Sequence, residues 1–118
     1  MFLKSDDCMQ AIKEKRSRCT LTYEDKKVEL VFSPTPHKKG QPFEIKISDA
    51  TIGSAQAQLI GLSMEMPTTL FDFTGRSLAA RISPGICTET KMRWRLKITF
   101  KGKNQEVYYT FIDYQVGR

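Results

Sequence analysis

Apolar and polar residues alternate along several short stretches of this chain, which is the pattern of β-strands with one face toward a core. In the clearest stretch, Trp94, Leu96, Ile98 and Phe100 would point one way and the basic and polar residues between them the other way. The same alternation marks residues 43–48 and 55–59, and shorter β-prone runs lie at 19–23, 28–32, 77–82 and 107–114. The pattern therefore predicts a protein built mainly from sheets.

Turn-forming residues separate these runs at short intervals. Residues 24–27 indicate a hairpin turn, and the three prolines within 33–42 indicate a loop because proline removes ladder donors. Further turns are expected at 83–85 and 101–104. About seven short strands at this spacing predict an all-β fold, an immunoglobulin-like antiparallel β-sandwich, with an open barrel as the alternative.

A short helix is expected ahead of the strands. Ser5 is a suitable N-cap, and the acidic residues Asp6 and Asp7 lie where the positive end of a helix dipole favours them. We therefore divide the chain into an N-terminal helical or linker segment, 1–18, and a β-sandwich domain, 19–118.

Composition and charge narrow the class of protein. The 118 residues, 40% of them hydrophobic and 27% charged, suit one globular domain with one core. The net charge of +6 favours anionic partners: lipid headgroups, nucleic acid or an acidic protein. Because Trp94 and Phe100 share the inward parity, aromatic residues do not interleave with the basic stripe of that strand, and we disfavour nucleic acid. A solvated β-face is the favoured interpretation of the stripe, and contact with an anionic membrane surface is the next.

Three cysteines, Cys8, Cys19 and Cys87, leave the redox state and the pairing open. A bridge from Cys19 to Cys87 would pack near Trp94, a bridge from Cys8 to Cys19 would staple the helix to the sheet, and three reduced thiols would suit a cytosolic protein. The first residues lack the pattern of a secretory signal, so we expect either a cytosolic protein or a signal or anchor ahead of Met1.

Met64 and Met66 would place two thioethers on one face of an extended segment. Thioether sulfur is a soft ligand that suits Cu(I), and Met92 and His37 are the candidates for completing such a site. The alternative is that the two methionines fill space at the edge of the core, since Leu62 has the same parity.

Motifs for catalysis are missing from the sequence. One histidine, His37, would have to support any Ser-His-Asp or Cys-His mechanism, and no nucleophile elbow, phosphate-binding loop or Cys-x-x-Cys pair occurs. We therefore predict a protein that is not an enzyme.

Three segments in order, 33–47, 61–66 and 87–94, give the chain a resemblance to the FixH/YtkA-like domains of the bacterial envelope. The resemblance covers about residues 19–114. It implies a sandwich that faces the periplasm, anchored to the inner membrane by a segment absent from this chain, with a protein partner there and a role in copper handling or oxidase assembly. Only Met64 and Met66 match the Met-rich segment of that family. Because Cys19 and Cys87 both belong to the region of resemblance, it favours the bridge between them.

A second function from a different class needs no metal. Leu70, Phe71 and Phe73 lie close to the methionines, and the segment 61–75 would then form an apolar patch for a protein partner. The oligomeric state is left open by the sequence.

Overall fold

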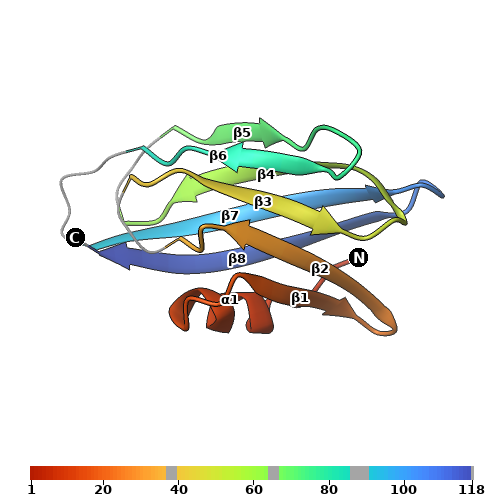
Figure 1. Ribbon diagram of the computed structural model, residues 1–118, viewed down its shortest axis with the longest axis horizontal. Helices are drawn as coiled ribbons and strands as arrows, with labels where there is room; N and C mark the ends of the chain where they lie inside the picture. The colour runs from red at the N-terminus through yellow and green to blue at the C-terminus, as the bar shows by residue number, and fades with distance from the viewer. Residues whose placement is uncertain (37–39, 64–66, 86–90, 118) are drawn as a thin grey trace.

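The computed structural model describes residues 1–36, 40–63, 67–85 and 91–117. Within them it contains one helix and eight strands, rather than the seven or so strands predicted (Figure 1). The elements in chain order are α1 (Asp6–Lys13), β1 (Arg18–Tyr23), β2 (Lys26–Ser33), β3 (Phe43–Ser48), β4 (Ile52–Gly61), β5 (Thr69–Asp72), β6 (Ala79–Ile82), β7 (Lys91–Gly102) and β8 (Val107–Gly117).

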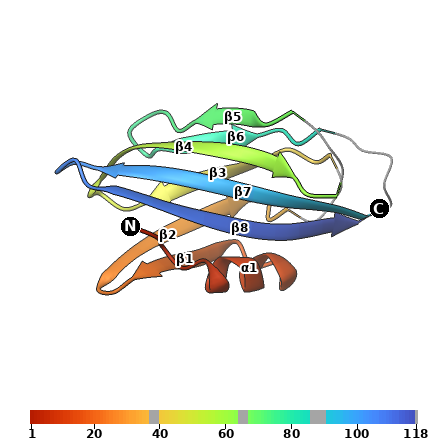
Figure 2. The same cartoon turned by 180° about the vertical axis from the view of Figure 1, so that it is seen from behind.

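The strands form two antiparallel sheets of four strands each, in the orders β1-β2-β3-β6 and β5-β4-β7-β8 (Figures 1 and 2). The predicted all-β sandwich with a short N-terminal helix is confirmed. The molecule is elongated along its strands, with extents of 43 × 26 × 23 Å.

Side-chain parity decides what each sheet contributes to the core. In β7, every second residue from Met92 to Phe100 is buried, and in β3 the side chains of Phe43, Ile45 and Ile47 are buried in the same way. The residues between them face outward. The predicted alternation of these two strands is confirmed.

The N-terminal segment closes one side of the sandwich. The Leu3 amide donates to the Tyr109 carbonyl of β8 at 2.8 Å, and Lys4 and Thr22 of β1 exchange backbone hydrogen bonds of 2.7 and 3.1 Å. Residues 1–4 therefore pair with one sheet and then with the other, and the Leu3 side chain is fully buried between them. The segment predicted as helical or linker is thus part of the single core.

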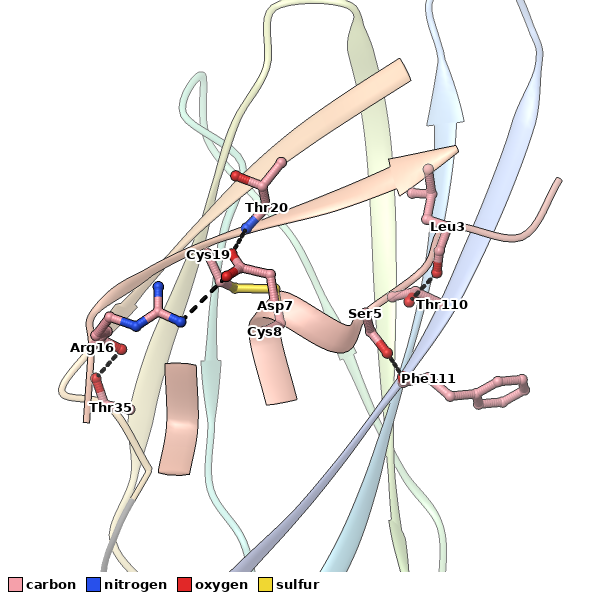
Figure 3. The surroundings of a disulfide bond; sticks show 10 residues. All are labelled: Leu3, Ser5, Asp7, Cys8, Arg16, Cys19, Thr20, Thr35, Thr110 and Phe111. Atoms are coloured by element: carbon pink, nitrogen blue, oxygen red, sulfur yellow. Dashed lines mark hydrogen bonds and ion pairs between the residues drawn. A yellow bond between two sulfur atoms is a disulfide. The ribbon is translucent and has the colours of Figure 1, made fainter. Parts of the chain in front are cut away.

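Ser5 occupies the N-cap position of α1, but its hydroxyl makes no capping hydrogen bond. It donates instead to the Phe111 carbonyl of β8 (Figure 3). One strand residue away, the buried Thr110 hydroxyl donates to the Leu3 carbonyl at 2.7 Å. Both hydroxyls attach the N-terminal segment to β8, so the predicted cap is replaced by a tertiary contact.

A disulfide joins Cys8 of α1 to Cys19 of β1 (Figure 3). The helix lies directly against β1, which brings the two Cα atoms to 4.8 Å, and the Asp7 carboxylate accepts a 2.8 Å hydrogen bond from the Thr20 amide beside them. The pairing of Cys19 with Cys87, which the family resemblance favoured, is therefore wrong, and the helix-to-sheet staple is the one formed. Cys87 lies outside the described residues.

A tight turn links β5 to β6 on the opposite side of the sandwich. Thr74 and Ala79 exchange backbone hydrogen bonds of 2.9 and 3.0 Å, and the turn between them uses Gly75 at φ +80° and Leu78 at φ 43°. The strand expected over 77–82 begins at Ala79 because this turn occupies its first residues.

Candidate binding surface

The outer face of β7 and β8 carries basic side chains on one strand and apolar side chains on the other. The strand register places Lys97 opposite Phe111 and Lys101 opposite Val107. Since neighbouring strands run about 4.8 Å apart, each pair places the aliphatic part of a lysine side chain alongside an apolar side chain.

Phe2 extends the apolar row from the beginning of the chain. Its ring centroid lies 5.4 Å from that of Tyr109 and 6.2 Å from that of Phe111, while Tyr109 and Phe111 are 5.9 Å apart. We call Phe2, Val107, Tyr109 and Phe111 together the β8 patch. Its rings pack mostly edge to face, an arrangement that stabilises aromatic clusters.

The β8 patch is open to solvent. Val107 is 48% exposed, Phe2 40% and Tyr109 37%, while Phe111, on the same face of β8, is half-buried. These are three of the six large hydrophobic side chains that stand exposed in the described part of the chain; the others are Met1, Leu62 and Leu70. Apolar groups gathered on one face mark an interaction site more often than groups scattered singly.

Two cations flank the Phe111 ring. The Arg95 guanidinium carbon lies 5.2 Å from the ring centroid and the Lys97 Nζ lies 6.0 Å from it. Arg95 also donates two hydrogen bonds, of 2.8 and 3.0 Å, to the Asp113 carboxylate, and these raise the pKa of Arg95. Lys97 and Lys101 form no ion pair with another described residue, so their charge is available to a ligand.

Sequence reasoning missed this surface because it searched for aromatic residues on the strand that carries the basic stripe. In the structure the aromatic side chains come from the neighbouring strand, β8, and from Phe2. The missed signal is the outward parity that Val107, Tyr109 and Phe111 share.

A shallow hollow of about 400 Å³ adjoins the patch across β4, β5, β7 and β8. Val107 of the patch and the neighbouring Lys101 line the hollow, and its other side is held by a 3.1 Å hydrogen bond from the Gln56 amide to the Asp72 carboxylate. The hollow widens the surface on which a ligand could rest.

The predicted metal ligands are not brought together in the described structure. Met92 is fully buried in the core on β7, where its thioether packs among apolar side chains. Met64, Met66 and His37 lie outside the described residues, so a copper site formed by them stays a prediction. In the ranges that are described, no three His, Cys, Asp or Glu side chains are grouped to hold a metal ion.

The predicted patch of Leu70, Phe71 and Phe73 is divided between two faces. Phe73 is 6% exposed and belongs to the core, and Phe71 packs against the core from β5. Only Leu70, 54% exposed, points to solvent. The strand pairs Phe71 with the inward Ala57, which is why these neighbours do not form one surface.

Comparison with known proteins found no match to a family model, a curated protein or a solved structure. None of the helical residues described forms a span long and apolar enough to cross a bilayer.

Proposed function

We propose that this chain is a non-enzymatic binding module of the bacterial envelope and that the β8 patch, with Lys97 and Lys101, is its binding surface. The observation that carries the proposal is the gathering of exposed Phe2, Val107 and Tyr109 from the two ends of the sequence beside two lysines that form no ion pair with another described residue. Exposed apolar side chains cost solubility, so their collection in one place favours a role in binding.

Two further observations support the setting. The Cys8–Cys19 disulfide suits an oxidising compartment outside the cytosol. The resemblance to FixH/YtkA-like domains points to the same compartment.

An immunoglobulin-like class is part of the proposal. Its support is the connectivity, in which the chain crosses between sheets from β3 to β4, from β5 to β6 and from β6 to β7. Cross-sheet connections of this kind are typical of Greek-key sandwiches.

The charged groups of the surface fit binding better than catalysis. Asp113 is engaged by Arg95, and the groups without an ion pair among the described residues are Lys97 and Lys101, which attract anions and offer no acid–base pair. An anionic protein partner at the inner membrane, or the anionic membrane surface itself, would complement these lysines.

Site-specific photo-crosslinking tests the proposal without assuming the ligand. A photoreactive phenylalanine analogue replaces Tyr109 in one variant and Lys46, on the outer face of the other sheet, in the control. In the periplasm of a bacterial host we expect covalent adducts, with protein or lipid, predominantly at position 109. Equal labelling at the two positions would show that the β8 patch is not a binding surface.

A further inference from the structure

We propose that the β8 patch rests on an anionic lipid bilayer, with its apolar side chains among the upper acyl chains and the neighbouring Lys97 and Lys101 on lipid phosphates. This inference rests on the proposed binding function and names the ligand class of the same surface.

The arrangement of apolar groups suits a shallow insertion. Phe2, Val107 and Tyr109 stand 40%, 48% and 37% exposed on the outer face, so they can leave water without any change in the fold. Tyr109 adds a hydroxyl that can stay at the level of the headgroups, where amphipathic rings are favoured in membranes.

The lysines stand where the headgroups would be. Lys97 and Lys101 are one strand inward from Phe111 and Val107 on the same face. Their long stems can run along the apolar row while the ammonium groups reach phosphate oxygens. Attraction of this kind to anionic lipids grows with each basic residue and weakens with salt.

Ring geometry disfavours a single-stranded nucleic acid as the ligand. Base stacking needs an open ring face, whereas Phe111 carries Arg95 and Lys97 over its ring and Phe2 meets Tyr109 at an interplanar angle of 65°. A second copy of the chain is disfavoured too, because a two-fold contact centred on the patch would bring the Lys97 and Lys101 of both copies together.

Vesicle flotation with the purified full chain tests the inference. We expect the protein to float with vesicles of phosphatidylcholine mixed with phosphatidylglycerol, to remain unbound with phosphatidylcholine alone, and to be released by added salt. A Lys97→Gln, Lys101→Gln variant should partition about 30-fold more weakly. A Val107→Ser, Tyr109→Ser variant should lose about tenfold.

Matched control variants distinguish binding through the β8 patch from non-specific adsorption to vesicles. Leu70→Ser removes the exposed apolar side chain at the far edge of the same sheet, and Lys46→Gln removes a charge from the other sheet. Both should bind like the wild type. Circular dichroism on each variant shows that it is folded, which is expected because every changed side chain is at the surface.

Two results would overturn the lipid assignment: no preference for the anionic vesicles, or equal binding by wild type and both patch variants. If flotation fails while position 109 crosslinks to a protein, the surface meets an acidic protein partner and the proposed binding function stands. If crosslinking at positions 109 and 46 is also equal, the binding function falls with it.

Discussion

Two buried aromatic side chains, Trp94 and Tyr114, carry polar atoms without a hydrogen-bond partner among the described residues. Trp94 and Tyr114 face each other across β7 and β8, both at least nine-tenths buried. Neither the indole Nε1 nor the phenol oxygen has a hydrogen-bond partner in the part of the chain that the structure describes. Burial raises the pKa of Tyr114, so this phenol stays neutral through the physiological range.

Removing the Tyr114 hydroxyl should therefore stabilise the protein. A buried hydroxyl without a partner loses its hydration and gains nothing in return, so Tyr114→Phe is expected to raise the free energy of unfolding by about 1 kcal/mol. Urea denaturation measures the change. Tyr109→Phe, at an exposed position, is the control and should leave stability within about 0.5 kcal/mol of the wild type. A loss of stability in Tyr114→Phe would mean that the hydroxyl is satisfied in the folded protein.

The alternation of inward and outward side chains along each strand explains how much of the fold and of the binding surface could be predicted from the sequence. In β3 and β7 one face is apolar and the other charged, so a period of two fixes both the strand and its inner side. In β8 both parities are largely apolar, and the inner row includes Thr110. The burial of Thr110 involves a hydrogen bond to Leu3, at the other end of the sequence, so the strand pattern alone could not place Phe2 beside the outward row of β8.

Among the elements, α1 depends on a contact that no local signal reveals. The helix is held to β1 by the Cys8–Cys19 disulfide and by the hydrogen bond between Asp7 and the Thr20 amide. Spacing alone allowed two pairings of Cys19, and only the packing of the helix against β1 selects one of them. The same packing makes the predicted N-terminal helix part of the core.

The disulfide should contribute a measurable part of the stability. It closes a loop between positions 11 residues apart, so replacing both cysteines, Cys8→Ala with Cys19→Ala, should lower the free energy of unfolding by about 3 kcal/mol. Guanidinium denaturation of the variant and of Cys87→Ala, the control, measures this cost. Non-reducing tryptic mapping should yield a linked peptide pair containing Cys8 and Cys19. A pair containing Cys19 and Cys87 would refute the assignment.

A second link joins the β1–β2 hairpin to the segment that crosses between the sheets. Lys26 Nζ lies 3.2 Å from the Asp49 carboxylate, which also accepts hydrogen bonds of 2.8 and 2.6 Å from the Thr51 amide and hydroxyl. Partial burial, the largest single influence, raises the pKa of Asp49, but the hydrogen bonds from Thr51 and Lys26 together lower it below its ordinary value of 3.8.

This link should weaken in acid. A carboxyl whose pKa is lowered by folding stabilises the native state above the pKa of the unfolded chain, and that contribution is lost as the pH falls through the lower, folded value. We expect the stability difference between wild type and Asp49→Asn to be largest at neutral pH and to shrink below about pH 4. Urea denaturation across this range measures it. Asp25→Asn, in the exposed hairpin turn, should differ little from wild type at any pH, and an unchanging Asp49→Asn difference would contradict the account.

At the scale of the whole molecule, the N-terminal segment connects the edges of the two sheets. Phe2 and Lys4 each form an isolated bridge, to Tyr109 of β8 and to Thr22 of β1, so the N-terminal segment covers part of both sheet edges on that side. The opposite side is joined by the turn between β5 and β6. The outer face of β7 and β8 carries the exposed aromatic rings of Phe2 and Tyr109.

The path of the first residues along β8 determines where a fusion partner, tag or tether can be attached without covering the aromatic rings. Met1 bonds to Val107 and Tyr109, so any fusion, tag or tether placed ahead of it must leave the molecule right beside the aromatic rings. The end of β8 lies at the far end of the long axis (Figure 1). A tether attached ahead of Met1 would hold the aromatic rings close to its own attachment point. A tag attached after β8 would leave these rings unobstructed.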